Sequence, residues 1–498
     1  MKPVGYTYLA QLSDIQAIMP ETMAEVRSVT RKEVIGPIMA VPAKLAPGEQ
    51  DILGHILFGL KHEGVNLSIL AQALPKVPEP ELRAAFDASP SSQYLRRACY
   101  LWEYFSGRVV HRQCEAIRQA YVPLFDPALY VTASTSVRTA RNARWRVTFN
   151  GLGTLDYCVT VRRTPELQAL LNKRLLQKAT EFTASLPKAV LNRTLAWAYL
   201  HETRDSYAIE NEAPSENKAT RFVNLLRQAH NPRKLDEDYL VELQNATISN
   251  VYGQAASFRT QQNYLSNGLR GALGVTYLPP PPVLGRELMD DLMALANGPP
   301  EGVDPLVLAA IVSFGFVFIH PFMDGNGRLS RFLFHQVLCQ QGSLENGLVL
   351  PVSMVLRQNE AEYLASLQVF SEPVRRLWEV TFIDEDQYQF EFKGHEAVYR
   401  YWDGTRGAEF MAQAADQAIE QHLKEETLFL IRYDEIYRYI DRAYDIPNSD
   451  LAKLVLFCMD QRGRLSKNRR KQYQYVVPSE VFDALERAYH QVVGSTPE

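Results

Sequence analysis

The sequence predicts a mainly α-helical protein made of several domains, and three observations indicate this fold class. A chain of 498 residues is too long for one ordinary core and suggests roughly three domains. Apolar residues recur at helical spacing through most of residues 1–135, 164–212 and 400–498. Period-two alternation, which is typical of β-strands, occurs only in short stretches.

The N-terminal part is expected to be a mixed α/β region. Residues 1–135 have a mostly helical pattern, in which residues 51–74 form two amphipathic helices around a turn at Gly64. This pair could be a helix-turn-helix, but a plain helical hairpin is commoner and no row of Arg or Lys marks the second helix. Nucleic-acid binding is therefore not favoured. Residues 136–234 are expected to hold a β-hairpin at 144–163, turning at Asn150–Gly151, and then helices as far as Glu212.

The central and C-terminal parts are expected to form two further domains. Residues 235–385 begin with a turn-rich, extended stretch that stops at Pro279–Pro282, continue with a helix at 286–298 and close with strand-like alternation from Leu377. Residues 400–498 are expected to be a helical C-terminal domain. Its basic stretch RGRLSKNRRKQYQY, residues 462–475, would suit a winged helix but is better explained as a solvated charged loop.

Composition narrows the classes of function. A formal net charge of -4 argues against a generally cationic nucleic-acid binder. No signal peptide begins the sequence, and no apolar run reaches the roughly 20 residues that span a bilayer. We therefore expect a cytoplasmic protein with no membrane contact. A reducing compartment fits the cysteines, which are odd in number, widely spaced and without a disulfide framework: Cys99, Cys114, Cys158, Cys339 and Cys458.

The stretch HPFMDGNGRLSR, His320–Arg331, lies between two predicted helices. Asp304 is a good N-cap and Pro305 a good first residue for a helix that ends at His320. This helix is apolar all round but only about 24 Å long, so it is predicted to be a central core helix and not a membrane span. The second helix is expected to begin near Gly327 and to run to Gly342.

The loop between these helices has the composition of a phosphate site. Gly325 and Gly327 permit a backbone that turns N–H groups toward an anion at the start of the second helix. Arg328 and Arg331 stand in the first helical turn, where cations oppose the helix dipole unless an anion lies between them. Asp324 fits beside phosphates if it binds a divalent cation such as Mg²⁺. With His320 as a general base, the set predicts nucleotidyl or phosphoryl transfer.

The same residues resemble the Fic-domain proteins, whose signature is H-P-F-x-[DE]-G-N-G-R-x-x-R. The resemblance covers about 150 residues. Its implied α-helical fold carries a β-hairpin flap, matched here at about 258–277 and followed by the proline-rich stretch. Every defined position of the signature is met, by His320, Pro321, Phe322, Asp324, Gly325, Asn326, Gly327, Arg328 and Arg331.

The resemblance implies an adenylyltransferase that moves AMP from ATP to a Ser, Thr or Tyr hydroxyl of a target protein, with Mg²⁺ or Mn²⁺ as the metal ion. By carry-over, His320 is the base and Asp324 the metal ligand. Gly325, Asn326 and Gly327 form the anion hole, and Arg328 and Arg331 hold the β- and γ-phosphates. The flap binds the target by strand addition, and self-AMPylation is another outcome. A kinase-like branch carries Lys in place of Gly327, which favours AMP transfer here; other branches use UTP or CDP-choline.

Residues 206–211, SYAIEN, resemble the inhibitory motif [ST]-x-x-x-E-[GN] of the class whose inhibitory helix precedes the Fic motif in the same chain. Ser206, Glu210 and Asn211 fill its defined positions. A carboxylate at a helix end and Arg331 at a helix start are each disfavoured by the helix dipole, so their pairing would stabilise both and inhibit the enzyme. Two alternatives remain at this stage: removal of AMP from the target, and a DNA-binding or scaffold regulator that carries a Fic module.

Overall fold

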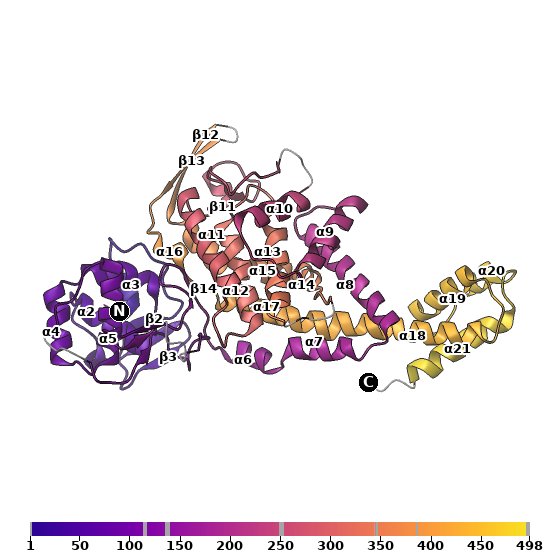
Figure 1. The fold of residues 1–498 in the computed structure, drawn as a ribbon, viewed down its shortest axis with the longest axis horizontal. Helices are drawn as coiled ribbons and strands as arrows, with labels where there is room; N and C mark the ends of the chain where they lie inside the picture. Colours follow the sequence, from indigo (N-terminus) through magenta and orange to yellow (C-terminus); the bar gives the residue numbers. More distant parts are fainter. Residues whose placement is uncertain are drawn as a thin grey trace.

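The computed structural model describes residues 2–112, 117–134, 140–248, 253–342, 344, 347–384 and 387–494, and Cys114 lies outside them. The chain is mainly α-helical, as the sequence predicts. Three parts follow one another along its longest axis in chain order (Figure 1). Each part has a large apolar cluster of its own, drawn from residues 6–158, 131–423 and 436–488. The middle cluster is the largest and carries the Fic-like motif.

The N-terminal part contains a small sheet that the helical prediction missed. Its four strands, in the order β1-β2-β4-β3, are only two to four residues long, too short to reveal alternation. The predicted helix pair around Gly64 is present, but nearly every residue of its second helix, α3, is buried, so α3 has no face to offer to DNA. The elements are β1 (Lys2–Pro3), α1 (Gly5–Ala10), β2 (Met23–Val26), β3 (Glu33–Ile35), β4 (Ile38–Val41), α2 (Ile52–His62), α3 (Leu67–Ala73), α4 (Glu79–Ala88) and α5 (Gln93–Ser106).

The hairpin expected at Asn150–Gly151 is not formed there. The strand before this pair, β7 (Val147–Thr148), pairs with β5 (Val122–Pro123) and β6 (Arg141–Asn142), whereas the strand after it, β8 (Leu152–Gly153), pairs with β9 (Cys158–Thr160). Neither Asn150 nor Gly151 has the positive φ that a tight hairpin turn needs, and Gly153 has it instead, at 120°. Asn150 is fully buried, and its amide exchanges two hydrogen bonds of 2.9 Å with the backbone of Phe125. Asn150 and Gly151 therefore connect the sheet that contains β7 to the sheet that contains β8.

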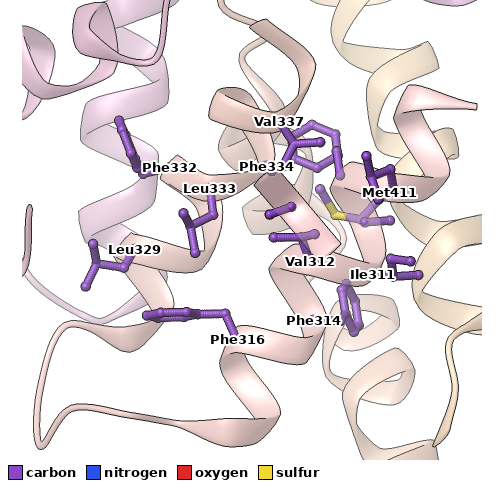
Figure 2. Packing of buried hydrophobic residues seen from close by; sticks show 14 of the residues in the cluster. Ile311, Val312, Phe314, Phe316, Leu329, Phe332, Leu333, Phe334, Val337 and Met411 are labelled. Atoms are coloured by element: carbon purple, nitrogen blue, oxygen red, sulfur yellow. The ribbon is translucent and has the colours of Figure 1, made fainter. Parts of the chain in front are cut away.

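The central part is built around two successive helices, α12 (Pro305–Ile319) and α13 (Asn326–Gln340). As predicted, Asp304 caps α12 by accepting from the Leu306 N–H, and Pro305 is its first residue. Side chains from both helices and from α17 interlock in the core (Figure 2). The surrounding helices are α6 (Pro165–Asn172), α7 (Leu175–Ala184), α8 (Lys188–Ile209), α9 (Glu216–Gln228), α10 (Glu237–Thr247), α11 (Pro282–Asn297), α14 (Val352–Gln358), α15 (Glu360–Arg375), α16 (Ala397–Arg400) and α17 (Thr405–Gln417).

Two β-hairpins border this helical body on one side (Figure 1). Strands β10 (Leu265–Ser266) and β11 (Val275–Tyr277) pair antiparallel inside the expected flap. The alternation from Leu377 forms β12 (Trp378–Asp384) and β13 (Gln387–Phe392). A domain boundary at 385 would cut this second hairpin, and the central apolar cluster continues to Leu423. Strand β14 (Tyr401–Asp403) runs parallel to β9. Strands β8 and β9, which the sequence analysis assigned to a region before the catalytic domain, therefore contribute residues to the central apolar cluster.

The C-terminal part is helical throughout, and the winged helix, which the sequence offered as a less favoured alternative, is not formed. Residues 404–494 are all described and contain no strand that could act as a wing. The basic stretch is not a loop but contains α20, in which Arg470 pairs with Asp483 and Glu486. Among the described residues, no helix has the length and apolarity needed to cross a bilayer. A π-helical turn (Ala418–Leu423) leads into α18 (Lys424–Asp441), α19 (Asn448–Asp460), α20 (Lys467–Tyr473) and α21 (Ser479–Gly494).

The buried Asn150 amide predicts a stability effect. Replacing Asn150 by Ala leaves the buried N–H and C=O of Phe125 without partners, and we expect a loss of about 1–3 kcal/mol of unfolding free energy. Urea unfolding followed by tryptophan fluorescence measures it. Asn172→Ala, at an exposed position on α6, is the matched control. Equal stability of the two variants would show that Asn150 does not join the sheets as described.

Candidate active site

His320 ends α12 in a left-handed backbone conformation, with φ 52° and ψ 60°. Its Nδ1 lies 3.0 Å from the Val317 carbonyl oxygen, one turn back along the helix. A carbonyl oxygen can only accept, so Nδ1 carries the proton and Nε2 is left unprotonated. This is the form of histidine that can remove a proton from a hydroxyl group.

Several groups set the protonation of His320. Burial is the main cause of a pKa lowered to about 4; the positive charge of Arg259 acts in the same direction. The hydrogen bond to Val317 and the carboxylates of Glu210 and Asp324 act in the opposite direction, but they do not offset burial. The imidazole is therefore neutral at physiological pH, as a general base requires.

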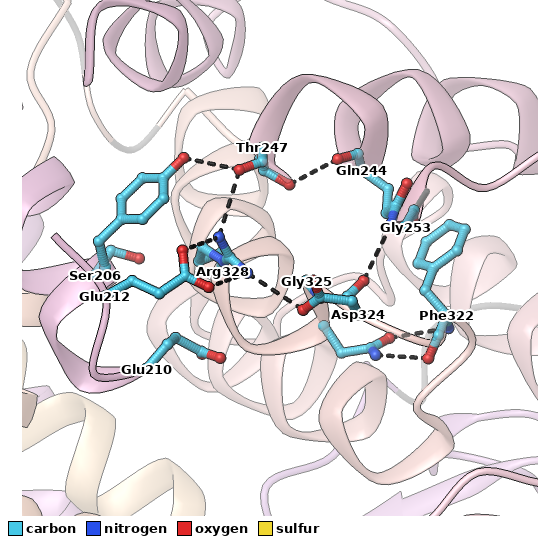
Figure 3. A network of polar contacts seen from close by, with 12 residues as sticks. Ser206, Glu210, Glu212, Gln244, Thr247, Gly253, Phe322, Asp324, Gly325 and Arg328 are labelled. Carbon is cyan, nitrogen blue, oxygen red and sulfur yellow. Dashed lines mark hydrogen bonds and ion pairs between the residues drawn. The ribbon is translucent and has the colours of Figure 1, made fainter. Parts of the chain in front are cut away.

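The loop after His320 is closed by the side chain of Asn326. Its Oδ1 accepts from the Phe322 N–H at 3.0 Å, and its Nδ2 donates to the Phe322 carbonyl at 2.8 Å (Figure 3). Both polar atoms of the amide thus have a partner inside the loop. Gly325 precedes α13 with φ 86°, which favours glycine, and its N–H donates to the Asp324 carboxylate at 2.6 Å.

Arg328 is almost fully buried, and two carboxylates hold it. Its Nη1 lies 3.1 Å from Glu212, and its Nη2 lies 3.3 Å from Asp324 (Figure 3). Its guanidinium also donates to the Thr247 carbonyl and lies 5.0 Å from the centre of the Tyr207 ring. An incoming phosphate would have to replace Glu212, which the sequence analysis did not identify.

Arg331, predicted to pair with Glu210, does so. Its Nη2 lies 3.0 Å from Glu210 Oε1, and its Nε donates to the Ser206 hydroxyl at 2.8 Å. Burial alone would raise the pKa of Glu210, but the arginines and His320 more than offset this, so the pKa lies below its ordinary value. The carboxylate occupies the space where a side chain at Gly327 would stand, because a Cβ there would be 2.0 Å from Glu210 Oε1.

The end of α8 explains why Glu210 and Glu212 both reach the arginines. Asn211 has φ 58°, and the N–H groups of Asn211 and Glu212 donate to the carbonyls of Ala208 and Tyr207. This is a Schellman C-cap, in which the left-handed position favours Gly or Asn. The cap reverses the chain and directs the two glutamates toward one helix start. The [GN] position of the motif thus has a backbone role, and cap geometry is the signal that could have identified Glu212.

Further along, a buried polar cluster holds α8 against α13. Glu202 on α8 lies 3.0 Å from Nε2 of His335 on α13 and accepts from the Ser353 hydroxyl at 2.6 Å and from its N–H at 2.8 Å. All three side chains are fully buried. Glu202, Ser206 and Glu210 follow each other at intervals of four residues, so one face of α8 carries the contacts to both His335 and Arg331.

Asp324 is the carboxylate available to a metal ion in the loop, and its side chain is half exposed. Among the described residues, no group of three His, Cys, Asp or Glu side chains could hold a metal ion by itself. The donors therefore fit a hard cation held by one carboxylate together with phosphate oxygens of a nucleotide. Gln244, fully buried on α10, supports the loop by donating to the Asp324 carbonyl at 3.2 Å. No sequence pattern marks Gln244.

The environment of His320 predicts its titration. Because burial lowers its pKa to about 4, the ring should stay neutral as pH falls through 6.5, where an ordinary histidine titrates. Histidine-selective NMR, with His320→Ala for assignment, measures the pKa and identifies the protonated nitrogen. A pKa near 6.5, or a proton on Nε2, would contradict the geometry.

Known proteins resemble the region that carries this site. A model of the Fic/DOC family matches residues 234–338. The protein adenylyltransferase fic-1 of Caenorhabditis elegans is 30% identical over 163 residues, which are 32% of this chain and 28% of that protein. The protein adenylyltransferase Fic of Nematostella vectensis is 27% identical over 139 residues, which are 26% of this chain and 29% of that protein. The match thus spans less than a third of the length of either relative.

Solved structures similar to this chain include a Fic family protein from Desulfovibrio desulfuricans G20. It is 19% identical, with a TM-score of 0.40, and the alignment covers 64% of this chain and 87% of that one. The structure of C. elegans Fic-1 is 16% identical, with a TM-score of 0.32, and the alignment covers 74% of this chain and 90% of that one. The family match includes the whole stretch from His320 to Arg331, and residues 234–338 thus form a domain of the Fic/DOC family.

Proposed function

We propose that this protein transfers AMP from ATP to a Ser, Thr or Tyr hydroxyl of a target protein, and that Glu210 inhibits the transfer. One observation carries the proposal: a neutral histidine at the end of α12 shares a loop with two buried arginines at the start of α13. The arginines are charged groups without solvent, in a place where the helix dipole disfavours cations. A polyphosphate would neutralise them, and its α-phosphate would meet a general base.

The reaction then follows from the residues. His320 Nε2 accepts the proton of the target hydroxyl while the oxygen attacks the α-phosphorus, and a new P–O bond forms. The bond from phosphorus to the bridging oxygen of the β-phosphate breaks, and pyrophosphate leaves. Backbone N–H groups at Gly325–Gly327 would stabilise the charge on the α-phosphate. Arg328 and Arg331 would hold the β- and γ-phosphates. A Mg²⁺ or Mn²⁺ ion on Asp324 would neutralise phosphate charge when bound.

Inhibition follows from the contacts of Arg331. This side chain is 2% exposed, and Ser206 and Glu210 together occupy its Nε and one Nη. A γ-phosphate cannot take the place of the Glu210 carboxylate without breaking its ion pair and leaving a partly buried carboxylate unpaired, which is costly. ATP would then bind without its γ-phosphate contact, with the α-phosphate misplaced for attack. Release of the end of α8 would restore the site.

The target would bind at the flap, by adding a strand beside β10, whose two residues are both exposed. The chain's own hydroxyl groups are further acceptors, so self-AMPylation is included in the proposal. The described cysteines, Cys99, Cys158, Cys339 and Cys458, are buried free thiols, which supports a reducing, cytoplasmic setting.

Radiolabelling tests the transfer and its inhibition together. Wild type, Glu210→Gly and His320→Ala are incubated with α-³²P-ATP, Mg²⁺ and a cell lysate. We expect Glu210→Gly to label proteins about 10- to 100-fold faster than wild type, because the charged contact to Arg331 is lost. His320→Ala, placed in the Glu210→Gly background, should lower the rate by about 100-fold or more.

The same reactions with γ-³²P-ATP are the control, since AMP transfer leaves no γ-label on protein. Label from γ-³²P-ATP that exceeds the label in the lysate alone and disappears with His320→Ala would indicate phosphorylation by this protein and contradict the proposal. If no variant uses ATP, then UTP and CDP-choline test the other donors of the family. Absence of transfer with all three donors would refute the transferase.

Glu212 is expected to add to the inhibition through Arg328. Because its side chain is 39% exposed, the ion pair is only partly shielded from water. Glu212→Gln should therefore tighten Mg²⁺-ATP binding by no more than about fivefold, measured by calorimetry in the Glu210→Gly background. Glu216→Gln, at an exposed position four residues further on, is the matched control. Unchanged affinity in both variants would limit the inhibition to Glu210.

A further inference from the structure

The flap does more than stand beside the active site, because it caps the end of α12. The last carbonyl groups of a helix have no partners within the helix. In this structure, flap residues donate hydrogen bonds to the last two carbonyls of α12 and to the three carbonyls that follow the helix. The contacts are Tyr277 Oη to the Phe318 carbonyl at 2.6 Å, Arg259 to the carbonyls of Ile319 (3.4 Å), His320 (2.9 Å) and Pro321 (2.8 Å, from the backbone N–H), and Asn263 to the Phe322 carbonyl at 2.9 Å.

Arg259 makes most of these contacts. It is 8% exposed, and it has no ion-pair partner within the residues that the structure describes. Its guanidinium also donates to the carbonyls of Pro280 at 2.6 Å and Gln261 at 3.1 Å. Burial lowers its pKa to about 10, so the side chain is still charged at neutral pH. A buried cation that binds only carbonyl oxygens is favoured at a helix C-terminus, where the dipole is negative.

These contacts enclose a disfavoured backbone conformation. His320 is not a glycine, yet its φ is 52°, a left-handed value that costs energy for residues with a Cβ. Arg259 binds the carbonyls just before, at and just after His320, so it fixes the peptide planes on both sides of this residue. The Nδ1 contact to Val317 depends on the same turn, because it requires the ring to point back along α12.

We propose that Arg259 is a positioning residue, which holds the His320 turn and thereby directs the Nε2 atom for proton abstraction. The inference rests on the proposed function, in which His320 is the base, and it deepens that function by assigning a role to the flap arginine. Arg259 acts through the backbone, because the hydrogen bonds that it donates all go to carbonyl oxygens. A displacement of about 1 Å at the base is enough to slow a transfer step by about 100-fold.

Arg375 provides a matched control. It anchors the flap from α15, donating to the carbonyls of Val275 at 2.8 Å, Ala272 at 2.9 Å and Trp378 at 3.1 Å. It therefore makes the same kind of contact as Arg259 but touches no residue of the His320 turn. Loss of Arg375 loosens the flap alone, whereas loss of Arg259 loosens the flap and the turn.

The experiment compares Arg259→Met and Arg259→Lys with Arg375→Met and Arg375→Lys, all in the Glu210→Gly background. The acceptor is the protein labelled most strongly from α-³²P-ATP by Glu210→Gly, the chain itself included. We expect Arg259→Met to lower kcat by about 10- to 100-fold while the KM for ATP changes less than about twofold. Arg259→Lys keeps the charge but has fewer donors, so its kcat should lie between that of Arg259→Met and that of the Glu210→Gly parent. The Arg375 variants should keep kcat within about threefold.

Histidine NMR of the same variants without ATP gives a second readout. Arg259→Met should lose the single Nδ1–H form of His320, while Arg375→Met should keep it. Circular dichroism checks that Arg259→Met folds. If it does not, Arg259→Lys is compared with Arg375→Lys, and the same differences in kcat and in the Nδ1–H form of His320 test the inference. Equal kcat losses in the Arg259 and Arg375 variants, or a loss confined to the KM for ATP, would overturn the inference. Inactivity of Glu210→Gly itself would refute the proposed function instead.

Discussion

Arg331 is a buried cation at the start of a helix, and the organisation of the site depends on how its charge is neutralised. Solvent does not reach it, and the dipole of α13 opposes it. Ser206 and Glu210 from the end of α8 now satisfy it. In the proposed reaction a phosphate takes their place. The same charge therefore stabilises the pairing with Glu210 and, in the proposed reaction, would hold the γ-phosphate, so the Glu210 contact and the γ-phosphate contact exclude each other.

The pairing requires α8 and α13 to keep a fixed register. Glu202 and His335 provide it, because both are fully buried and both belong to helices that also carry the contact between Glu210 and Arg331. Both are polar groups in the protein interior, and moving either one away from its polar neighbour is costly, so α8 cannot slide along α13 freely. Tyr207 anchors the next position, because it is fully buried and its hydroxyl donates to the Thr247 carbonyl at 2.8 Å. The two carboxylates that would have to move, Glu210 and Glu212, follow it and are 28% and 39% exposed. The register of α8 against α13 is thus fixed by buried residues, and the two carboxylates at its end are partly exposed.

On the other side of the loop, the elements act together to hold one turn. Asn326 closes the loop from within, Gln244 supports it from α10, and Arg259 fixes it from the flap. Each of these side chains is buried and donates to backbone carbonyls, which makes the loop rigid without occupying the space of a ligand. A rigid loop suits chemistry that depends on positioning a base and an anion hole.

The sequence by itself determined the features that are local in the chain. The caps of α12, the glycine-containing loop and the start of α13 follow from residue types at short spacing, because helix ends and tight loops obey local rules. The pairing of Arg331 with Glu210, 121 residues away, was expected only from the resemblance of residues 206–211 to the inhibitory motif. The C-cap of α8 was also readable locally, because its left-handed position favours Gly or Asn and Asn211 occupies it. The short strands of the N-terminal part were not predictable, because two to four residues carry no period.

Only the tertiary structure decided the contacts between distant segments. Asn150 followed by Gly151 favours a hairpin locally, but the buried backbone of Phe125 takes its amide and prevents the turn. Glu212 meets Arg328, and Arg259 meets the His320 turn, although more than 60 residues separate the partners in each pair. Such pairings follow from the burial of polar groups that need partners, and burial is known only when the chain has packed.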